Sequence, residues 1–249
     1  MLTAIYMVFG KHKKYILLLV LFLFSCTAKE YKVVDGVKKI EFGSQDGEKI
    51  SWTVISEDEK NMTLFSDDIL DAREFESISK LKTEEDFSFA TSDICEYLNS
   101  DFINICFSKK ERERLVFINE YDDVLVTLIS LDNLIDLDLG EIDYIQGEYY
   151  NNDKYFSANE KIIAKPTKQA LYNDIEVFDN ETFAEIMEQK KVDTRYDFAN
   201  GHSPYWTVNI ADKGLVYTVT STGYIEPREA DSLYIGVRPV IKIKKEGNS

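Results

Sequence analysis

Histidine is almost absent from this chain of 249 residues, which contains only His12 and His202. His12 lies in an N-terminal leader, so His202 is the one histidine left for the remaining chain. A single histidine excludes metal sites with two histidine ligands and leaves one candidate base for a Ser–His or Cys–His arrangement. His202 lies in the segment ANGHSP, which is typical of a loop, so we expect an exposed side chain.

The common catalytic motifs are also absent. The sequence contains no G-x-S-x-G, H-E-x-x-H, G-x-x-x-x-G-K-[ST] or G-x-G-x-x-G pattern. Paired carboxylates can hydrolyse glycosidic bonds, but in a chain with 45 acidic residues the presence of carboxylates does not distinguish a hydrolase from other proteins. We therefore expect a protein that is not an enzyme and that needs no cofactor.

Basic residues are the minority, because 29 lysines and arginines face 45 acidic residues, a net charge of −16. The leader contains three of the lysines and no acid, so the rest of the chain has 26 basic residues against 45 and a net charge of −19. This charge repels nucleic-acid phosphates and anionic lipid headgroups alike. The acids are spread along the chain, which is typical of a solvated surface.

No apolar run is long enough to span a bilayer. The longest, residues 15–24, would form a helix of about 15 Å, half of a hydrocarbon core of about 30 Å. Three lysines precede it, and Ser25 and Cys26 follow it. A basic segment, a short apolar segment and a small residue before a cleavage site are the parts of a secretory signal peptide.

The sequence L-F-S-C at residues 23–26 resembles the lipobox of bacterial lipoproteins. The resemblance implies that residues 1–25 are removed and that Cys26 becomes a diacylated N-terminus. Residues 26–36 would then be the lipidated N-terminus and its tether, and membrane contact would come from the acyl chains alone. We expect a bacterial cell membrane or outer membrane location, facing the periplasm or the exterior. An uncleaved anchor that uses residues 1–9 as extra apolar length is the alternative.

Two further cysteines, Cys95 and Cys106, follow a helical pattern of apolar residues. A continuous helix would separate their Cα atoms by roughly 16 Å, whereas a disulfide needs about 4.4–6.8 Å. We expect two buried thiols, unless the chain turns near residues 99–101.

The rest of the chain, residues 37–249, has the pattern of one α+β domain. Alternating segments predict a hairpin of strands within residues 37–66, and the last third returns to strands. Ser92, Ser130 and Asn180 are expected helix caps, and Ser108 with Glu111 forms a capping box. No linker rich in proline or glycine divides the domain.

Short motifs in this domain resemble an uncharacterised family of bacterial, often extracytoplasmic, domains. The blocks are F-G-S and I-S-W-T-V, then L-D-A-R-E-F, Y-L-N, K-P-T, Y-W-T and G-V-R-P, in the family's order from about residue 37 to 244. The motif residues, expected to be structural, are Trp52, Asp71, Arg73, Leu98, Asn99, Pro166, Trp206, Gly236, Arg238 and Pro239. At residues 208–212, V-N-I-A-D replaces the family's L-R-S-P-G.

This family resembles C-type-lectin-like folds, which implies mostly antiparallel strands, a few short helices and pairing of the first and last strands. Formylglycine-type oxidation uses cysteines near the C-terminal end of that fold, so this activity is not expected here. The resemblance and the residues together predict core tryptophans and a buried ion pair between Arg238 and a strand carboxylate.

The sequence suggests two binding chemistries, calcium coordination and aromatic stacking. Asp136, Asp138, Glu141 and Asp143 lie close together, but the EF-hand spacing fails, and alternation with Leu and Ile favours a half-buried strand or helix face. Glu226-Pro227-Arg228 lacks the asparagine of the sugar-binding lectin motif. Tyrosines suit saccharide and protein surfaces. The predicted ligand-binding residues are Tyr149, Tyr150, Tyr155, Tyr205 and Tyr224.

The sequence therefore predicts a lipid-anchored binding module for an unknown protein or surface glycan. Two alternatives stay open: a cell-wall-acting hydrolase with an unidentified carboxylate pair, and a structural envelope lipoprotein.

Overall fold

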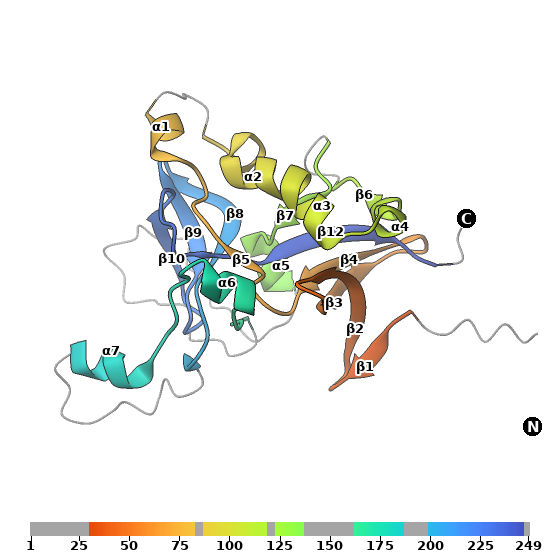
Figure 1. Cartoon of the computed structure of the whole chain (residues 1–249), viewed down its shortest axis with the longest axis horizontal. Helices are drawn as coiled ribbons and strands as arrows, with labels where there is room; N and C mark the ends of the chain where they lie inside the picture. The colour runs from red at the N-terminus through yellow and green to blue at the C-terminus, as the bar shows by residue number, and fades with distance from the viewer. Residues whose placement is uncertain (1–29, 83–86, 119–122, 137–161, 187–198, 247–249) are drawn as a thin grey trace, which may run out of the picture.

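The computed structural model describes residues 30–82, 87–118, 123–136, 162–186 and 199–246, which form two sheets with short helices around them (Figure 1). The predicted α+β class with mostly antiparallel strands is confirmed. The first sheet has the order β1 (Lys32–Val34), β2 (Val37–Gln45), β3 (Glu48–Glu57), β4 (Asn61–Ser66), β12 (Pro239–Lys244) and β6 (Leu115–Val116), with β7 (Val126–Leu128) also paired to β12. The second has the order β10 (Ile225–Glu229), β9 (Leu215–Val219), β8 (Tyr205–Asp212), β11 (Gly236–Val237) and β5 (Asp71–Ala72).

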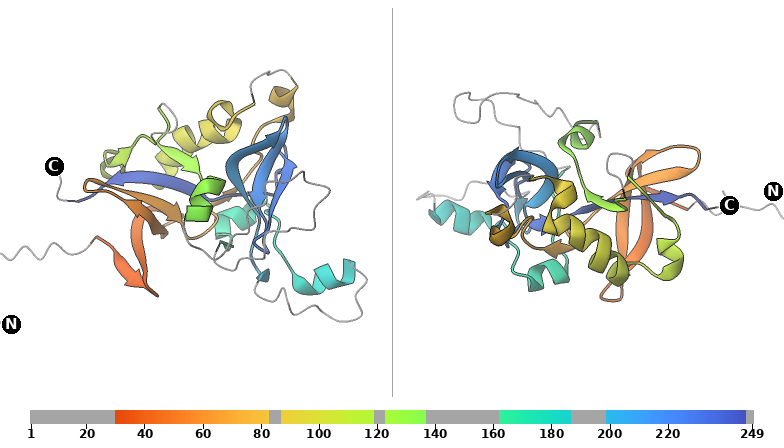
Figure 2. Two further views of the ribbon diagram at one scale, coloured as in Figure 1. Left: turned by 180° about the vertical axis from the view of Figure 1, so that it is seen from behind. Right: turned by 90° about the horizontal axis from the view of Figure 1, so that it is seen from above.

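The helices are short, and the longest continuous one is built from three named segments. These are α2 (Asp93–Tyr97), η2 (Leu98–Phe102) and α3 (Ile103–Cys106), which together lie across the region where the two sheets meet (Figures 1 and 2). Cys95 and Cys106 are buried free thiols on this helix, as predicted. The other helices are α1 (Ile78–Leu81), η1 (Phe89–Thr91), α4 (Lys109–Arg112), α5 (Leu131–Asp136), α6 (Lys168–Tyr172) and α7 (Asn180–Ile186).

Three of the four predicted helix caps are confirmed. The Ser92 hydroxyl accepts from the Cys95 amide at 3.3 Å, Ser108 and Glu111 form the capping box, and the Ser130 hydroxyl accepts from the Asn133 amide at 3.1 Å. Asn180 is the exception. The Asp179 carboxylate caps α7 by accepting from the Glu181 amide at 3.1 Å, and Asn180 is already helical. Aspartate and asparagine are nearly equally favourable as N-caps, so the sequence could not show whether Asp179 or Asn180 caps this helix.

Two of the connections between the sheets are short and lie side by side. Residues 67–70 carry the chain from β4 to β5, and Arg238 alone separates β11 from β12. The Leu70 amide donates to the Val237 carbonyl at 2.9 Å, and the Arg238 Nε donates to the Ser66 carbonyl at 2.9 Å. The last strand therefore lies beside β4, whereas β1 pairs with β2. This pairing differs from the one that the lectin-like resemblance implies.

Both tryptophans are buried in the core, as predicted. The Trp52 indole donates to the Phe42 carbonyl at 2.6 Å, and the Trp206 indole donates to the Arg73 carbonyl at 2.9 Å. Gly236 belongs to the same packed region. A Cβ at Gly236 would lie 2.4 Å from the Ile69 Cγ2 and 2.8 Å from the Pro204 carbonyl oxygen, so only glycine fits without a backbone shift.

Candidate functional site

A buried carboxylate, that of Asp71 on β5, organises the most distinctive polar cluster of the described chain. Its oxygens accept four hydrogen bonds: from the Ala72 amide at 2.8 Å, the Asn173 side-chain amide at 2.5 Å, the Arg73 Nη2 at 3.1 Å and the Tyr97 hydroxyl at 2.6 Å. These donors come from β5, from α2 and from the end of α6. Asp71 therefore fixes three segments relative to one another and sets the position of Arg73.

Arg73 is held at the surface by this cluster. Its Cζ lies 3.1 Å from the centroid of the Tyr97 ring, a close cation–π arrangement. Burial, together with the Asp71 carboxylate, raises the pKa of the Tyr97 hydroxyl, so this hydroxyl stays protonated and donates. The Arg73 side chain keeps 34% of its surface exposed, although its Nε is buried and has no hydrogen-bond partner among the described residues. The cluster thus presents a fixed cation to the outside.

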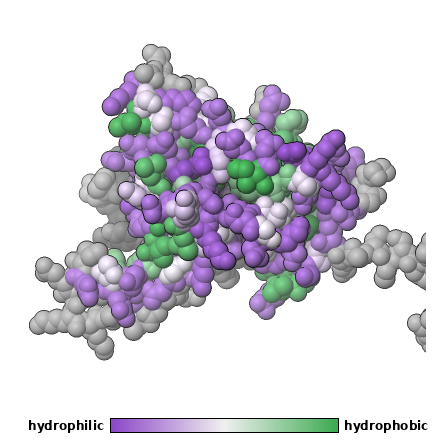
Figure 3. Space-filling model, viewed as in Figure 1, coloured by the Kyte–Doolittle hydropathy of each residue, from purple (hydrophilic) through white to green (hydrophobic). Residues whose placement is uncertain are grey.

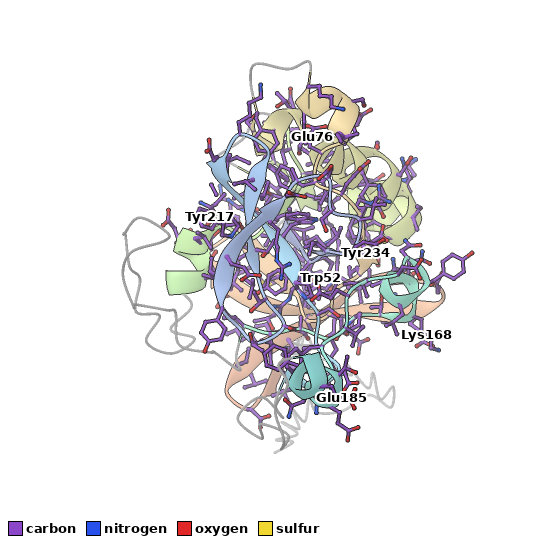
Figure 4. All side chains as sticks on the ribbon, turned by 90° about the vertical axis from the view of Figure 1, so that its left-hand side faces the viewer. Trp52, Glu76, Lys168, Glu185, Tyr217 and Tyr234 are labelled. Carbon is purple, nitrogen blue, oxygen red and sulfur yellow. The ribbon has the colours of Figure 1, made fainter. Side chains whose placement is uncertain are left out.

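Exposed apolar side chains occur on the segments next to this cation. The Glu176 amide donates to the Tyr234 carbonyl at 3.0 Å and the Arg73 amide to the Ile235 carbonyl at 3.2 Å, which places the end of α6, residues 173–177 and the turn at 231–235 side by side. Tyr172 is 83% exposed and Tyr234 55%. Figure 3 shows apolar atoms at α6 within a polar surround, and Figure 4 shows Tyr234 on the same side as Lys168 of α6. We call this surface the α6 face; it comprises Arg73, Leu171, Tyr172, Val177, Leu233 and Tyr234.

The α6 face has the chemistry of binding rather than of catalysis. None of its six side chains is a nucleophile or a general base near neutral pH. No group of three His, Cys, Asp or Glu that could hold a metal ion occurs in the described part of the chain. Tyrosine and arginine are enriched in the cores of protein interfaces.

Only some of the predicted ligand-binding tyrosines are among the residues that the structure describes. Tyr149, Tyr150 and Tyr155 lie outside the described residues, as does Cys26. Tyr205 is fully buried, and its hydroxyl donates to the Ile162 carbonyl at 2.7 Å, so its prediction as a ligand-binding residue is wrong. Tyr205 begins β8 with its side chain in the core, and the tyrosine count could not reveal that direction. Tyr224 is half-buried, and its binding role stays a prediction.

Arg238 is structural, but its predicted ion pair with a strand carboxylate is wrong. The guanidinium donates to the Ser66 carbonyl at 2.9 Å, to the Ile162 carbonyl at 2.7 Å and to the Tyr205 hydroxyl at 3.2 Å. Backbone oxygens therefore replace the expected carboxylate. Asn99 also has a structural role, because its side chain accepts from the Leu125 and Val126 amides at 2.8 and 3.0 Å.

His202 is half-buried and not the exposed side chain that its loop sequence predicts. Its carbonyl accepts from the Phe178 amide at 2.9 Å, which packs the loop against the chain before α7. Burial lowers the pKa of its imidazole, and Nδ1 has no hydrogen-bond partner within the described ranges. No cysteine lies close in sequence, and no contact in the described chain arranges a nucleophile against this ring.

Sequence reasoning missed one carboxyl pair, Glu76 and Asp93, which hydrogen-bond to each other. Glu76 lies next to α1 (Figure 4). Burial and the neighbouring Asp93 raise the pKa of Glu76 to about 7. Burial opposes ionisation of Asp93, but hydrogen bonds from Glu76, Ser77 and Lys80 outweigh it and lower the pKa of Asp93. The Ser77 amide is 2.9 Å and the Lys80 Nζ 3.2 Å from the Asp93 carboxylate.

Carboxyls with separated pKa values can serve as catalytic acid and base. Here the Glu76 side chain is buried and bonded directly to its partner, whereas glycosidase carboxyls stand about 5–9.5 Å apart around the scissile bond. A substrate has no access between them. The two residues are separated by 17 positions and no local pattern joins them, so only the fold reveals the pair.

No protein-family model, curated protein or solved structure matches the chain. The motif resemblance accordingly stays a prediction. Within the described ranges, every helix is too short or too polar to cross a membrane.

Proposed function

We propose that this chain is a lipid-anchored, extracytoplasmic bacterial lipoprotein that acts as a non-catalytic interaction module and binds a protein partner through the α6 face. The observation that carries the binding role is that the exposed Tyr172 and Tyr234 lie on segments that adjoin the fixed Arg73. The signal-peptide pattern and Cys26 support the anchor.

The composition of the α6 face favours a protein over a surface glycan. Leu171, Val177 and Leu233 are each at least two-fifths exposed, and aliphatic side chains cannot hydrogen-bond to sugar hydroxyls. Arg73 is pre-positioned by Asp71, so a partner would not have to immobilise it on binding. A glycan ligand is the runner-up, since tyrosines also stack on sugars.

Replacing Tyr172 and Tyr234 together by alanine is expected to abolish partner capture with little effect on stability. Exposed side chains contribute within about 0.5 kcal/mol to folding, whereas aromatic interface anchors contribute about 2 kcal/mol or more to binding, roughly thirtyfold in affinity. The measurement is crosslinking on intact cells, with Ile105→Ala as the control because Ile105 is exposed on α3. Equal crosslinking by the double variant and the control would rule out the α6 face.

Replacing Cys26 by alanine is expected to release the protein from the membrane and to remove its acyl chains. The checks are membrane fractionation and incorporation of labelled palmitate, with Cys95→Ala as the matched control because Cys95 is a buried thiol. Membrane retention of Cys26→Ala would show that the leader itself is the anchor. Turnover of cell-wall fragments by the purified protein would instead support the hydrolase alternative.

A further inference from the structure

The β1–β2 hairpin ends in an exposed apolar tip that the α6 face does not include. Val33 is 60% exposed, Val34 49% and Val37 41%. Val34 and Val37 pair across a two-residue turn at Asp35 and Gly36, which both have positive φ, so the tip is a tight hairpin turn. Figure 1 shows β1 at the lower edge of the molecule, and Figure 3 shows apolar atoms there.

The basic side chains behind the tip are all paired with carboxylates. Lys32 lies 3.6 Å from Glu41, Lys38 pairs with Glu57, and Lys39 lies 2.5 Å from Asp67. These pairs leave little net charge behind the tip, whereas Asp35 adds an exposed carboxylate in the turn itself. The valines can therefore reach a neutral lipid surface with this carboxylate at the level of the hydrated headgroups.

The chain length before the hairpin restricts what can cover the tip. Six residue steps connect Cys26 to Lys32, which span at most about 20 Å when fully extended. If Cys26 carries acyl chains, the tip cannot move far from the membrane surface. Three valines are also too few for a stable contact with a second copy, because standard interfaces use about 20–30 residues a side.

We propose that the tip formed by Val33, Val34 and Val37 lies in the interfacial layer of the membrane that holds the acyl chains, and that it limits the orientations of the domain. This inference rests on the lipid anchor of the proposed function. The tip supplies a second, weaker contact, so the domain is held at two points rather than by the acyl chains alone.

The test uses the full, lipidated chain in phosphatidylcholine vesicles, with an environment-sensitive nitrobenzoxadiazole label at Val34→Cys. The matched control is the same label at Ile78→Cys, since Ile78 on α1 is 54% exposed and lies at the opposite end of the molecule from β1 in Figure 1. Unsubstituted protein corrects for labelling of the buried thiols. Brominated lipids are expected to quench the label at residue 34 about threefold more than at residue 78, because interfacial apolar groups lie about 5–10 Å deep.

The outcomes separate the two proposals. Flotation of the protein with the vesicles but equal quenching at both positions overturns the hairpin contact and leaves the anchor intact. Failure to float overturns the anchor and the inference together. A third outcome is that the fluorescence of the label at residue 34 is blue-shifted, that brominated lipids do not quench it, and that the shift grows with protein concentration. This outcome would assign the tip to contact with a second copy and would also overturn the inference.

Discussion

Replacing Arg238 by methionine is expected to lower the free energy of unfolding by about 3–5 kcal/mol, because it removes three hydrogen bonds from a buried, charged donor at the connection between the sheets. Arg238 is buried and donates to two backbone carbonyls, those of Ser66 and Ile162, and to the Tyr205 hydroxyl. Methionine fills a similar volume but donates no hydrogen bond. The Ser66 carbonyl would then be buried without this donor, at about 1–3 kcal/mol, whereas the Ile162 carbonyl would keep its hydrogen bond from the Tyr205 hydroxyl.

The measurement is urea unfolding, with Lys244→Met as the control because Lys244 is exposed on the same strand, β12. Lys244→Met is expected to unfold within about 0.5 kcal/mol of the original protein. Arg238→Lys should recover only part of the loss, since an ammonium group cannot reproduce the planar guanidinium that reaches both carbonyls. Equal urea midpoints for Arg238→Met and Lys244→Met would show that the connection does not depend on this arginine.

Local signals in the sequence predicted much of the fold. The strands within residues 37–66, the helix that carries Cys95 and Cys106, and the capping box of Ser108 and Glu111 depend on residues close together in the chain. Alternation, helical spacing and capping chemistry act over a few residues, so each is legible before the chain folds. The expected burial of both tryptophans follows from the same patterns.

The partners of Arg238 show why the rest could not be predicted. Ser66, Ile162 and Tyr205 lie 172, 76 and 33 residues away from it. A charge next to a strand suggested an opposite charge, but the fold brings two carbonyls to Arg238 at the place where the chain passes from β11 in one sheet to β12 in the other. The α6 face is likewise assembled from the end of β5, the end of α6 and the turn before β11. No local sequence pattern therefore marked Tyr172 as part of a binding surface.

The pair of Glu76 and Asp93 extends this argument to electrostatics. Asp93 lies in the first turn of α2, where the helix dipole and the Ser77 amide favour a negative charge. Glu76 is buried against it and is the partner that takes the proton. A sequence with 45 acids offers no way to select these two, whereas the burial of Glu76 and its hydrogen bond with Asp93 do.

Replacing Glu76 by glutamine is expected to raise the free energy of unfolding at pH 8 by about 2–3 kcal/mol, from a pKa displacement worth about 1.4 kcal/mol per unit. An unfolded glutamate loses its proton near pH 4.5, whereas folded Glu76 keeps it until about pH 7. Between these values the folded state binds more protons, so stability falls as pH rises. The lowered pKa of Asp93 acts in the opposite sense, because its stabilisation is present above pH 3.8 and is lost at lower pH.

Stability from this pair should therefore be greatest near pH 4–4.5 and decline towards pH 8. Glutamine can donate to the Asp93 carboxylate at every pH, so the variant should lose the decline and melt about 4–10 °C above the original protein at pH 8. Near pH 4.5 the two should differ by less than about 1 kcal/mol, since Glu76 is then neutral in the folded protein. The comparison is made by thermal unfolding from pH 4 to 8. Glu96→Gln is the control because Glu96 is exposed on α2, the helix that contains Asp93. If melting temperature depended on pH in the same way for the original protein and both variants, Glu76 would already be ionised in the folded state, and the carboxyl pair would not share a proton.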